Sequence, residues 1–212
     1  MSDLLLVLNA GSSSLKFALY DRFLDLHLKG GISGLSSRPR LKIREAGGAA
    51  EQAELGGEPM EMKDAVARVF EALEERGVLR AVVAVGHRIV HGGERWTAPT
   101  RLDAAILAEL RRLGPLAPLH QPLNLDIVDA AAGLLPGAAQ IGCFDTAFHA
   151  TRPRLERLYG LPRELSEEGL VAYGFHGLSY EYIASVLTER FGPAAGGRTI
   201  VAHLGSGVSL CA

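Results

Sequence analysis

Four short polar segments, each placed directly after an apolar run, carry the side chains that could do chemistry. The first is residues 9–16 (NAGSSSLK), the second is residues 86–94 (GHRIVHGGE), and the others contain Leu119-His120 and Asp145-Thr146. Polar loops at strand ends are where α/β proteins build their sites, because the strand is fixed while the loop backbone can face a ligand. The sequence therefore predicts a site assembled from several strand ends.

The segment at residues 9–16 has the composition of a phosphate-binding loop. It offers unhindered backbone amides, three hydroxyl groups, a carboxamide and one ammonium group, which all suit phosphate oxygens. It lacks the spacing of a P-loop and leads into a strand rather than a helix, which argues against a Walker-type site. A plain hairpin turn next to a lysine stays the alternative interpretation.

Arg88 and Asp145 are the two charged residues that close apolar runs. An arginine among glycines after a buried strand serves either in a buried ion pair or as a bidentate clamp on a carboxylate or phosphate. An aspartate at a strand end either belongs to a site or caps a turn or helix. The residues alone leave both pairs of alternatives open.

The histidines argue against a zinc enzyme. The chain has seven, and none forms the HExxH pattern or an i, i+4 pair on a predicted helix. His176 and His203 stand out because each lies in a glycine-flanked loop. The second of these loops, residues 203–207 (HLGSG), joins two strand-like runs and resembles the first hairpin in its layout.

Apolar runs and helical periodicity alternate along the chain, which is typical of an α/β protein. Residues 30–60 look like an exposed excursion with weak strand pattern, and the prolines within 115–122 favour neither a helix nor a central strand. Tyr182, Ile183, Val186 and Leu187 form the expected buried side of the last helix. The predicted strands are 4–9, 15–20, 81–85 and 139–144, and the predicted helices are 64–76, 106–113, 123–135, 153–161 and 179–191.

Composition excludes several classes of protein. The 212 residues carry 22 Lys+Arg against 24 Asp+Glu, and the net charge of −2 gives no basic field for nucleic acid or an anionic membrane surface. No apolar run has the length of a spanning helix, and the N-terminus lacks the pattern of a signal peptide, so we expect a cytoplasmic protein. Cys143 and Cys211 are expected to be small core residues.

Six segments, in order along the whole chain, resemble the acetate kinase family within the actin, sugar kinase and heat-shock ATPase superfamily. They are LVLNAGSSSLK (6–16), GHRIVHGG (86–93), APLH (117–120), FDTAFH (144–149), YGFHG (173–177) and HLGSG (203–207). The resemblance implies an α/β, ribonuclease H-like mixed sheet flanked by helices, with the start of a second similar domain. Residues 1–150 would form an acid- and phosphate-binding domain, and residues 151–212 the beginning of a nucleotide-binding domain.

The resemblance also implies roles for individual residues. Arg88 would bind the carboxylate of acetate and then the transferring phosphoryl group, to which His120 and His176 would donate hydrogen bonds. Asp145 would be the active-site acid. The remaining implied roles are Mg²⁺ binding by Asn9 and Asp145, an apolar substrate pocket of Val90, Leu119 and Phe175, and two phosphate loops, one with Ser12, Ser14 and Lys16 and one with His203, Leu204, Gly205, Ser206 and Gly207.

The implied reaction is reversible phosphoryl transfer between ATP and acetate, giving acetyl phosphate and ADP, with Mg²⁺ or Mn²⁺. Ser206 departs from the family, which usually has Asn there. The complete protein is expected to be a homodimer, and the 212 residues to be a truncated chain that is inactive by itself. Alternatives are a kinase for propionate or another short-chain acid, a noncatalytic half-domain that binds a partner, and an unrelated metal hydrolase.

Overall fold

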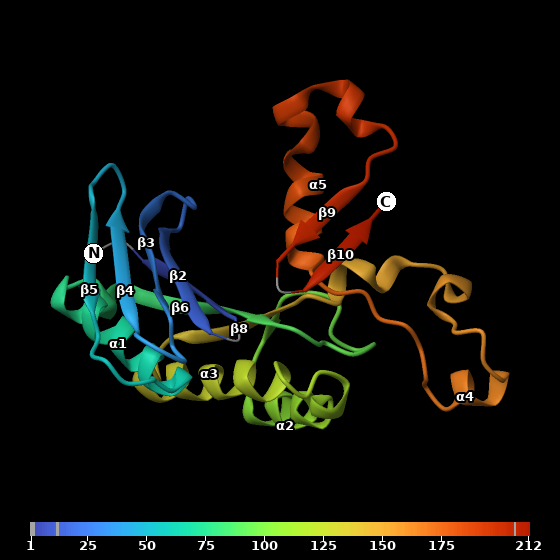
Figure 1. The fold of residues 1–212 in the computed structure, drawn as a ribbon, viewed down its shortest axis with the longest axis horizontal. Coiled ribbons are helices and arrows are strands. Elements are labelled where there is room, and N and C mark those ends of the chain that lie inside the picture. The colour runs from blue at the N-terminus through green and yellow to red at the C-terminus, as the bar shows by residue number, and fades with distance from the viewer. Residues whose placement is uncertain (1–2, 12, 206) are drawn as a thin grey trace. The chain divides into compact units, whose positions relative to one another are not determined.

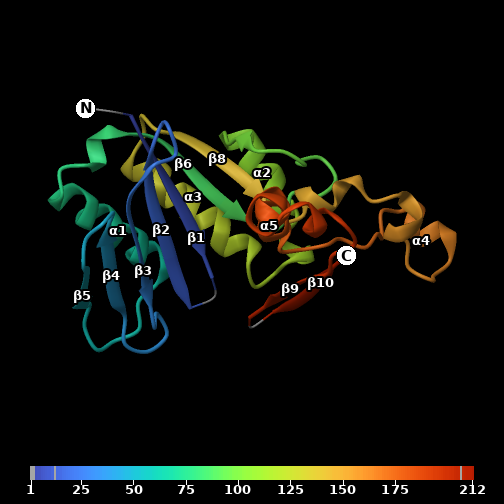
Figure 2. The ribbon, with the colours of Figure 1, turned by 90° about the horizontal axis from the view of Figure 1, so that it is seen from above.

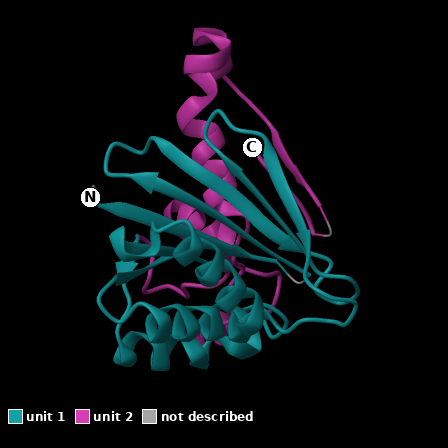
Figure 3. Ribbon diagram, turned by 90° about the vertical axis from the view of Figure 1, so that its left-hand side faces the viewer, with its two compact units in different colours: residues 1–89, 99–143 teal, residues 90–98, 144–212 magenta. Residues whose placement is uncertain are grey.

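The computed structural model describes residues 3–11, 13–205 and 207–212. Ser12 and Ser206, two of the expected phosphate-loop residues, lie outside the described residues. The chain forms two compact units, the first made of residues 1–89 and 99–143 and the second of residues 90–98 and 144–212 (Figure 3). The expected domain boundary after residue 150 stays a prediction.

An eight-stranded mixed sheet organises the first unit, with the strand order β5-β4-β3-β2-β1-β6-β8-β7 (Figure 1). Strands β1 to β5 form an antiparallel meander, and β1 then pairs in parallel with β6. The strands are β1 (Leu4–Ala10), β2 (Ser14–Asp21), β3 (Leu26–Ser33), β4 (Arg40–Glu45), β5 (Ala50–Glu54), β6 (Val82–Ile89), β7 (Thr100–Arg101) and β8 (Ala139–Phe144).

The expectation for residues 30–60 was wrong in part, because this segment supplies much of the meander. In β4, Leu41 and Ile43 point to the buried face while the alternating Arg40, Lys42 and Arg44 are exposed. This period of two is that of a strand with one wet face. Strand β5 is exposed throughout, so its sequence carries no such pattern and its position depends on pairing with β4.

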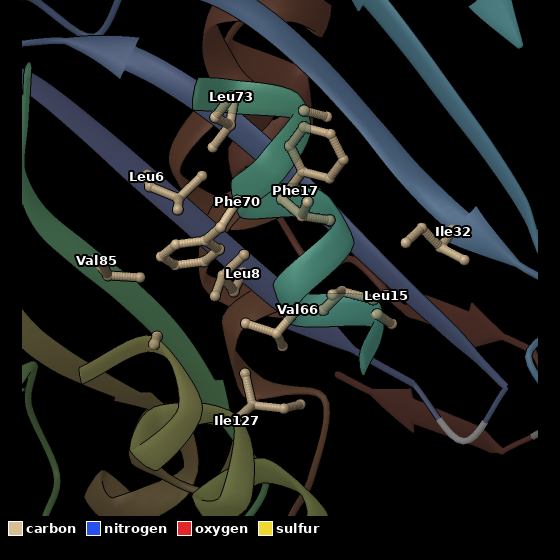
Figure 4. Packing of buried hydrophobic residues seen from close by; sticks show 14 of the residues in the cluster. Leu6, Leu8, Leu15, Phe17, Ile32, Val66, Phe70, Leu73, Val85 and Ile127 are labelled. Carbon is tan, nitrogen blue, oxygen red and sulfur yellow. The ribbon is translucent and has the colours of Figure 1, made fainter. Parts of the chain in front are cut away.

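Helices α1 (Met62–Glu75) and α3 (Gln121–Leu134) cover one face of the sheet, as Figure 4 shows from close by. Helix α1 presents Val66, Val69, Phe70 and Leu73 to Leu6 and Leu8 of β1, which are almost fully buried. Burying each such side chain contributes about 1.5–3 kcal/mol to folding. This core holds β1 and β6 rigidly, and their ends carry predicted site residues.

The helices of the first unit begin and end where local chemistry allows. Helix α1 ends at Glu75, and Gly77 follows with φ 67°, a left-handed conformation that glycine adopts without strain. Asp103 caps α2 (Ala104–Arg112) by accepting the Ile106 amide hydrogen. The expectation that residues 115–122 form no helix was wrong at both ends of the stretch. A short 3₁₀ turn covers Gly114–Leu116, and Pro122 lies in the first turn of α3, where its missing N–H is tolerated.

The second unit contains one long helix, α5 (Gly177–Phe191), and an antiparallel hairpin of β9 (Val201–Leu204) and β10 (Val208–Cys211) (Figure 2). The expected helix at 153–161 was wrong, since only the 3₁₀ turn Arg154–Arg157 forms there. The buried side of α5 also differs from expectation: Tyr182 is 59% exposed, whereas Tyr180 is 2% exposed. The short elements are η1 (Leu79–Ala81), η3 (Ala147–Thr151), η4 (Arg154–Arg157), α4 (Arg163–Glu167) and η5 (Pro193–Gly196).

Two further sequence expectations concern the whole chain. Among the described residues, no helix combines the length and apolar character needed to cross a bilayer. Cys143 and Cys211 are half-buried thiols rather than fully buried core residues.

His87 lies in the middle of the sheet, on β6, and is 2% exposed. Its Nε2 is 2.7 Å from Oε1 of Gln140 on β8, and the Gln140 amide nitrogen donates to the Ala138 carbonyl, so Oε1 is the acceptor. His87 therefore carries its proton on Nε2. Burial lowers the pKa of His87 from 6.5 to about 4, because the sheet interior disfavours the charged imidazolium.

The lowered pKa of His87 makes stability depend on pH. Because the unfolded chain binds a proton to His87 below pH 6.5 and the folded chain does not, the free energy of unfolding should fall by about 3 kcal/mol as pH decreases from 6.5 to about 4. Urea unfolding followed by circular dichroism should show this slope in the parent chain and a shallower one in His87→Gln. Above about pH 7.5, where His87 is neutral in both states, the two chains should differ by a constant amount. Equal slopes below pH 6.5 would contradict the prediction.

Candidate active site

The first hairpin, between β1 and β2, places three predicted phosphate or metal ligands close together. Asn9 of β1 is directly opposite Lys16 of β2, and both side chains are exposed on the sheet face away from the helices. The turn is closed by the Gly11 amide, which donates to the Ser14 carbonyl at 2.8 Å. The register therefore puts a carboxamide and an ammonium group side by side at one end of the hairpin.

A groove of about 670 Å³ lies on this exposed sheet face and is lined by Asn9, Ser14 and Lys16. Its wall also carries three further cationic side chains, which are Lys29, Lys42 and Arg44. No carboxylate is among the described residues that line it. A concave surface lined by positively charged side chains concentrates anions, so this face of the first unit is suited to phosphate groups.

Arg88 emerges near the end of β6, next to the first hairpin. The parallel register pairs Leu8 with His87, which brings the following residues, Asn9 and Arg88, to the same end of the two strands. Nη1 of Arg88 is 3.4 Å from Oδ1 of Asn9. Arg88 was expected to bind the phosphoryl group and Asn9 to bind Mg²⁺. The structure places these two side chains within hydrogen-bonding distance of each other.

The remaining predicted residues of the first unit lie at the start of α3. His120 is the residue that precedes the helix, and it is half-buried. Leu119, expected in the apolar substrate pocket, is 81% exposed. Within the first unit, Leu119 is therefore a surface side chain.

In the second unit, Asp145 follows β8 directly and its side chain is 2% exposed. The Gly177 amide donates to the Asp145 carbonyl oxygen at 2.9 Å, so the start of α5 is joined to the end of β8. The contact is so close that a Cβ on Gly177 would lie 2.2 Å from that oxygen. Glycine is thus required in the YGFHG motif by backbone packing.

His176 and His203, the two histidines singled out by their glycine-flanked loops, are brought together. Their rings stack with centroids 4.0 Å apart and an interplanar angle of 13°. His176 precedes α5 in a left-handed backbone conformation (φ 58°), and His203 lies on β9. Leu204, at the end of β9, is 75% exposed, and Gly205 and Gly207 form the described part of the turn.

Val90 and Phe175 are the two predicted pocket residues of the second unit. His91, which was not predicted to take part in the site, follows Val90 in the chain and contacts Phe175. Val90 is 7% exposed, and the buried ring of His91 contacts Phe175 edge-on at 5.7 Å and Tyr173 at 4.4 Å. The Gly93 amide donates to Nδ1 of His91 at 2.9 Å, which leaves the imidazole proton on Nε2. Burial lowers the pKa of His91, so it favours the neutral ring.

Oxygen ligands for a divalent cation are present in both units. Asn9 offers an amide oxygen and Asp145 a carboxylate, which are the hard donors that Mg²⁺ prefers. In the described part of the chain, no three His, Cys, Asp or Glu side chains gather as a metal cluster. Among the described residues, each unit by itself offers one predicted oxygen donor, and neither has the cluster of ligands that a zinc site closed by protein needs.

Comparisons with known proteins decide the family. The profile of the Acetokinase family matches residues 4–212. This chain belongs to the acetokinase family. An acetate kinase of Rhodopseudomonas palustris (strain TIE-1) is 46% identical over 218 residues, which cover all of this chain and 55% of that protein.

Solved structures of a propionate kinase and an acetate kinase agree with this chain in fold. A propionate kinase from Francisella tularensis subsp. tularensis SCHU S4 superposes with a TM-score of 0.84 at 30% identity, over 98% of this chain and 54% of that one. Porphyromonas gingivalis acetate kinase superposes with a TM-score of 0.80 at 35% identity, over 99% and 54%. The resemblance and the fold class inferred from the six motifs are confirmed: the mixed sheet has the actin and sugar kinase type of fold. The chain spans about half the length of the acetate and propionate kinases that it matches.

The packing of Gly177 against Asp145 gives a test of the second unit. Gly177→Ala should lower the free energy of unfolding by about 2 kcal/mol or more, because its Cβ has no room beside the Asp145 carbonyl. Urea unfolding can be followed by the fluorescence of Trp96, the single tryptophan, which is buried in this unit. Gly160→Ala is the matched control, since no atom lies within 4 Å of a Cβ there. Equal stability of the two variants would show that the close approach does not constrain residue 177.

Proposed function

We propose that the protein containing this chain is an acetate kinase, which transfers a phosphoryl group reversibly between ATP and acetate. The observation that carries the proposal is the match to the acetokinase family over residues 4–212. A carboxylate oxygen of acetate attacks the γ-phosphorus, the new O–P bond gives acetyl phosphate, and the bond to the bridging oxygen breaks with its electron pair remaining on ADP. We also propose that the whole protein is a homodimer that acts in the cytoplasm, where ATP is supplied.

The chemistry requires charge neutralisation more than proton transfer. Acetate is already ionised near neutral pH, because carboxyl groups have pKa values of about 4. Its obstacle is the repulsion between two anions, and phosphoryl transfer is catalysed mainly by positioning and by cations around the equatorial oxygens. Arg88 would hold first the carboxylate and then the phosphoryl group, while His120 and His176 would donate hydrogen bonds to it.

The metal and nucleotide contacts belong to the same proposal. Asn9 and Asp145 would supply oxygen ligands to Mg²⁺ or Mn²⁺, which when bound neutralises phosphate charge. Ser12, Ser14 and Lys16 would contact phosphate from the first hairpin, and the second hairpin would contribute His203, Leu204, Gly205, Ser206 and Gly207. The cationic groove beside Asn9 and Lys16 supports the first of these two assignments.

The acid that is phosphorylated is a short one. Val90, Leu119 and Phe175 would surround its alkyl group, and Val90 is buried and belongs to the same sequence motif as Arg88. Since a propionate kinase superposes on this chain, propionate is the second candidate substrate. One methylene in an apolar pocket changes specificity by only about 1–3 kcal/mol, so small changes at Val90 would be enough to shift the preference.

Removal of the Arg88 side chain tests the phosphoryl-transfer role. Arg88→Ala in the whole protein should lower kcat by about 10²-fold or more, because the transition state loses the guanidinium group that neutralises its negative charge. Acetyl phosphate formation can be measured by trapping with hydroxylamine. Arg80→Ala is the matched control, since Arg80 is 87% exposed and pairs with Glu74 alone among the described carboxylates. Near-normal turnover in Arg88→Ala would remove Arg88 from the mechanism.

The size of the acid pocket can be tested separately. Val90→Ala should raise the ratio of kcat/KM for propionate to that for acetate by about tenfold, because the shorter side chain makes room for a methylene. Val83→Ala, on the exposed part of β6 (42% exposed), should leave the ratio at its original value. An unchanged ratio in Val90→Ala would place the alkyl group elsewhere.

A further inference from the structure

Three polar side chains of the second unit form a continuous hydrogen-bonded chain that ends on His176. The hydroxyl oxygen of Tyr180 is 2.5 Å from Oγ of Ser209, and that oxygen is 2.7 Å from Nδ1 of His176. Tyr180 follows His176 by one turn of α5, and Ser209 comes from β10 of the hairpin. Tyr180 and Ser209 were not among the residues expected from the sequence to take part in the site.

The backbone around His176 aims its other ring nitrogen at the glycine turn. His176 has φ 58° and ψ 20°, a left-handed conformation that is costly for a residue with a side chain and that clusters at functional sites. Its ring lies flat on His203, and a Cβ on Gly207 would be 3.7 Å from Nε2. The ring therefore presents Nδ1 to Ser209 and its Nε2 edge to the turn that follows His203.

Counting protons separates three possible arrangements of the chain. In the first, Tyr180 donates to Ser209, Ser209 donates to Nδ1, and the imidazole proton is on Nε2. In the second, Nδ1 donates to Ser209 and Ser209 donates to Tyr180, so the phenol proton needs another acceptor. In the third, Tyr180 and Nδ1 both donate to Ser209, so the proton of the half-buried Ser209 needs an acceptor, and the described residues offer it none besides these two. Tyr180 is 2% exposed, and among residues 3–11, 13–205 and 207–212 its hydroxyl has no hydrogen-bond partner besides Ser209. A buried donor without an acceptor is unfavourable, which favours the first arrangement.

We propose that Ser209 and Tyr180 are positioning residues that hold His176 in the tautomer with its proton on Nε2. The use of this tautomer rests on the proposed function. With its proton on Nε2, a neutral His176 donates a hydrogen bond to a phosphoryl oxygen without first acquiring a charge. The tautomer of a histidine is set by the hydrogen bond of its other nitrogen. The phenol ring is itself fixed by edge contact with His149 at 5.8 Å and by packing on Phe148.

The tautomer can be read directly, without an activity assay. In the ¹⁵N-histidine-labelled 212-residue chain at about pH 8, where a histidine of ordinary pKa is neutral, two-bond ¹H–¹⁵N correlations distinguish a protonated from an unprotonated ring nitrogen. We expect His176 to be protonated on Nε2. Ser209→Ala and Tyr180→Phe should each lower the ratio of the Nε2–H to the Nδ1–H form by about fivefold. Ser209→Thr, which keeps the hydroxyl, should restore the parent ratio.

Two internal controls make the experiment specific. Ser179→Ala removes a hydroxyl 3.2 Å from Nδ1 of His203 and should leave the ratio at His176 unchanged. His149 must donate from Nε2 to the Phe175 carbonyl, 3.0 Å away, because a carbonyl accepts only, so its signal reports in every variant that the unit is folded. If Ser209→Ala loses that signal, Tyr180→Phe and Ser209→Thr decide the result.

The outcomes separate this inference from the proposed function. A parent His176 protonated on Nδ1, or a ratio that Ser209→Ala and Tyr180→Phe leave unchanged, overturns the inference. A change in Ser179→Ala as large as that in Ser209→Ala overturns it too. Addition of inorganic phosphate should shift the Nε2 resonance of His176. If it does not while the tautomer is as expected, the positioning role stands and the assignment of His176 to phosphoryl binding fails.

Discussion

The hydrogen bond from the Gly177 amide to the Asp145 carbonyl is the contact on which the second unit depends. It joins the end of a buried strand to the first turn of α5, at a distance that excludes any side chain on residue 177. This contact holds the backbone of Asp145 against the residue that follows His176, which has a left-handed conformation. The hairpin of β9 and β10 contacts His176 through Ser209 and His203.

In the first unit the corresponding constraint is the parallel pairing of β1 with β6. Its register brings Asn9 and Arg88 to the same end of the sheet, although the two residues are 79 positions apart in the sequence. The helices cover one face of these strands, so the opposite face is free to carry the lysine and arginine side chains that line the groove. The apolar core on one face of the sheet stabilises the fold, and the other face can therefore carry several positively charged side chains.

The sequence predicted the parts of the structure in which hydrophobic pattern and packing coincide. Strand β8 and helices α1, α2 and α3 were recognised because their buried positions repeat with the period of their element. Strand β5 could not be recognised, since all of its residues are exposed and it is ordered by pairing alone. The site residues came from motif resemblance, whereas Ser209 and Tyr180 matter through contacts across 29 residues that no spacing rule reports.

The first five strands are paired in the order of the sequence, which affects how the chain folds during synthesis. The meander of β1 to β5 needs only contacts between neighbours in sequence, so it can form as soon as residue 54 has emerged. Its apolar face, with Leu6, Phe17 and Ile32, then has no cover until α1 follows. At this stage the nascent meander exposes apolar surface, which favours aggregation. Because α1 follows β5 after only a short connection, that interval is brief.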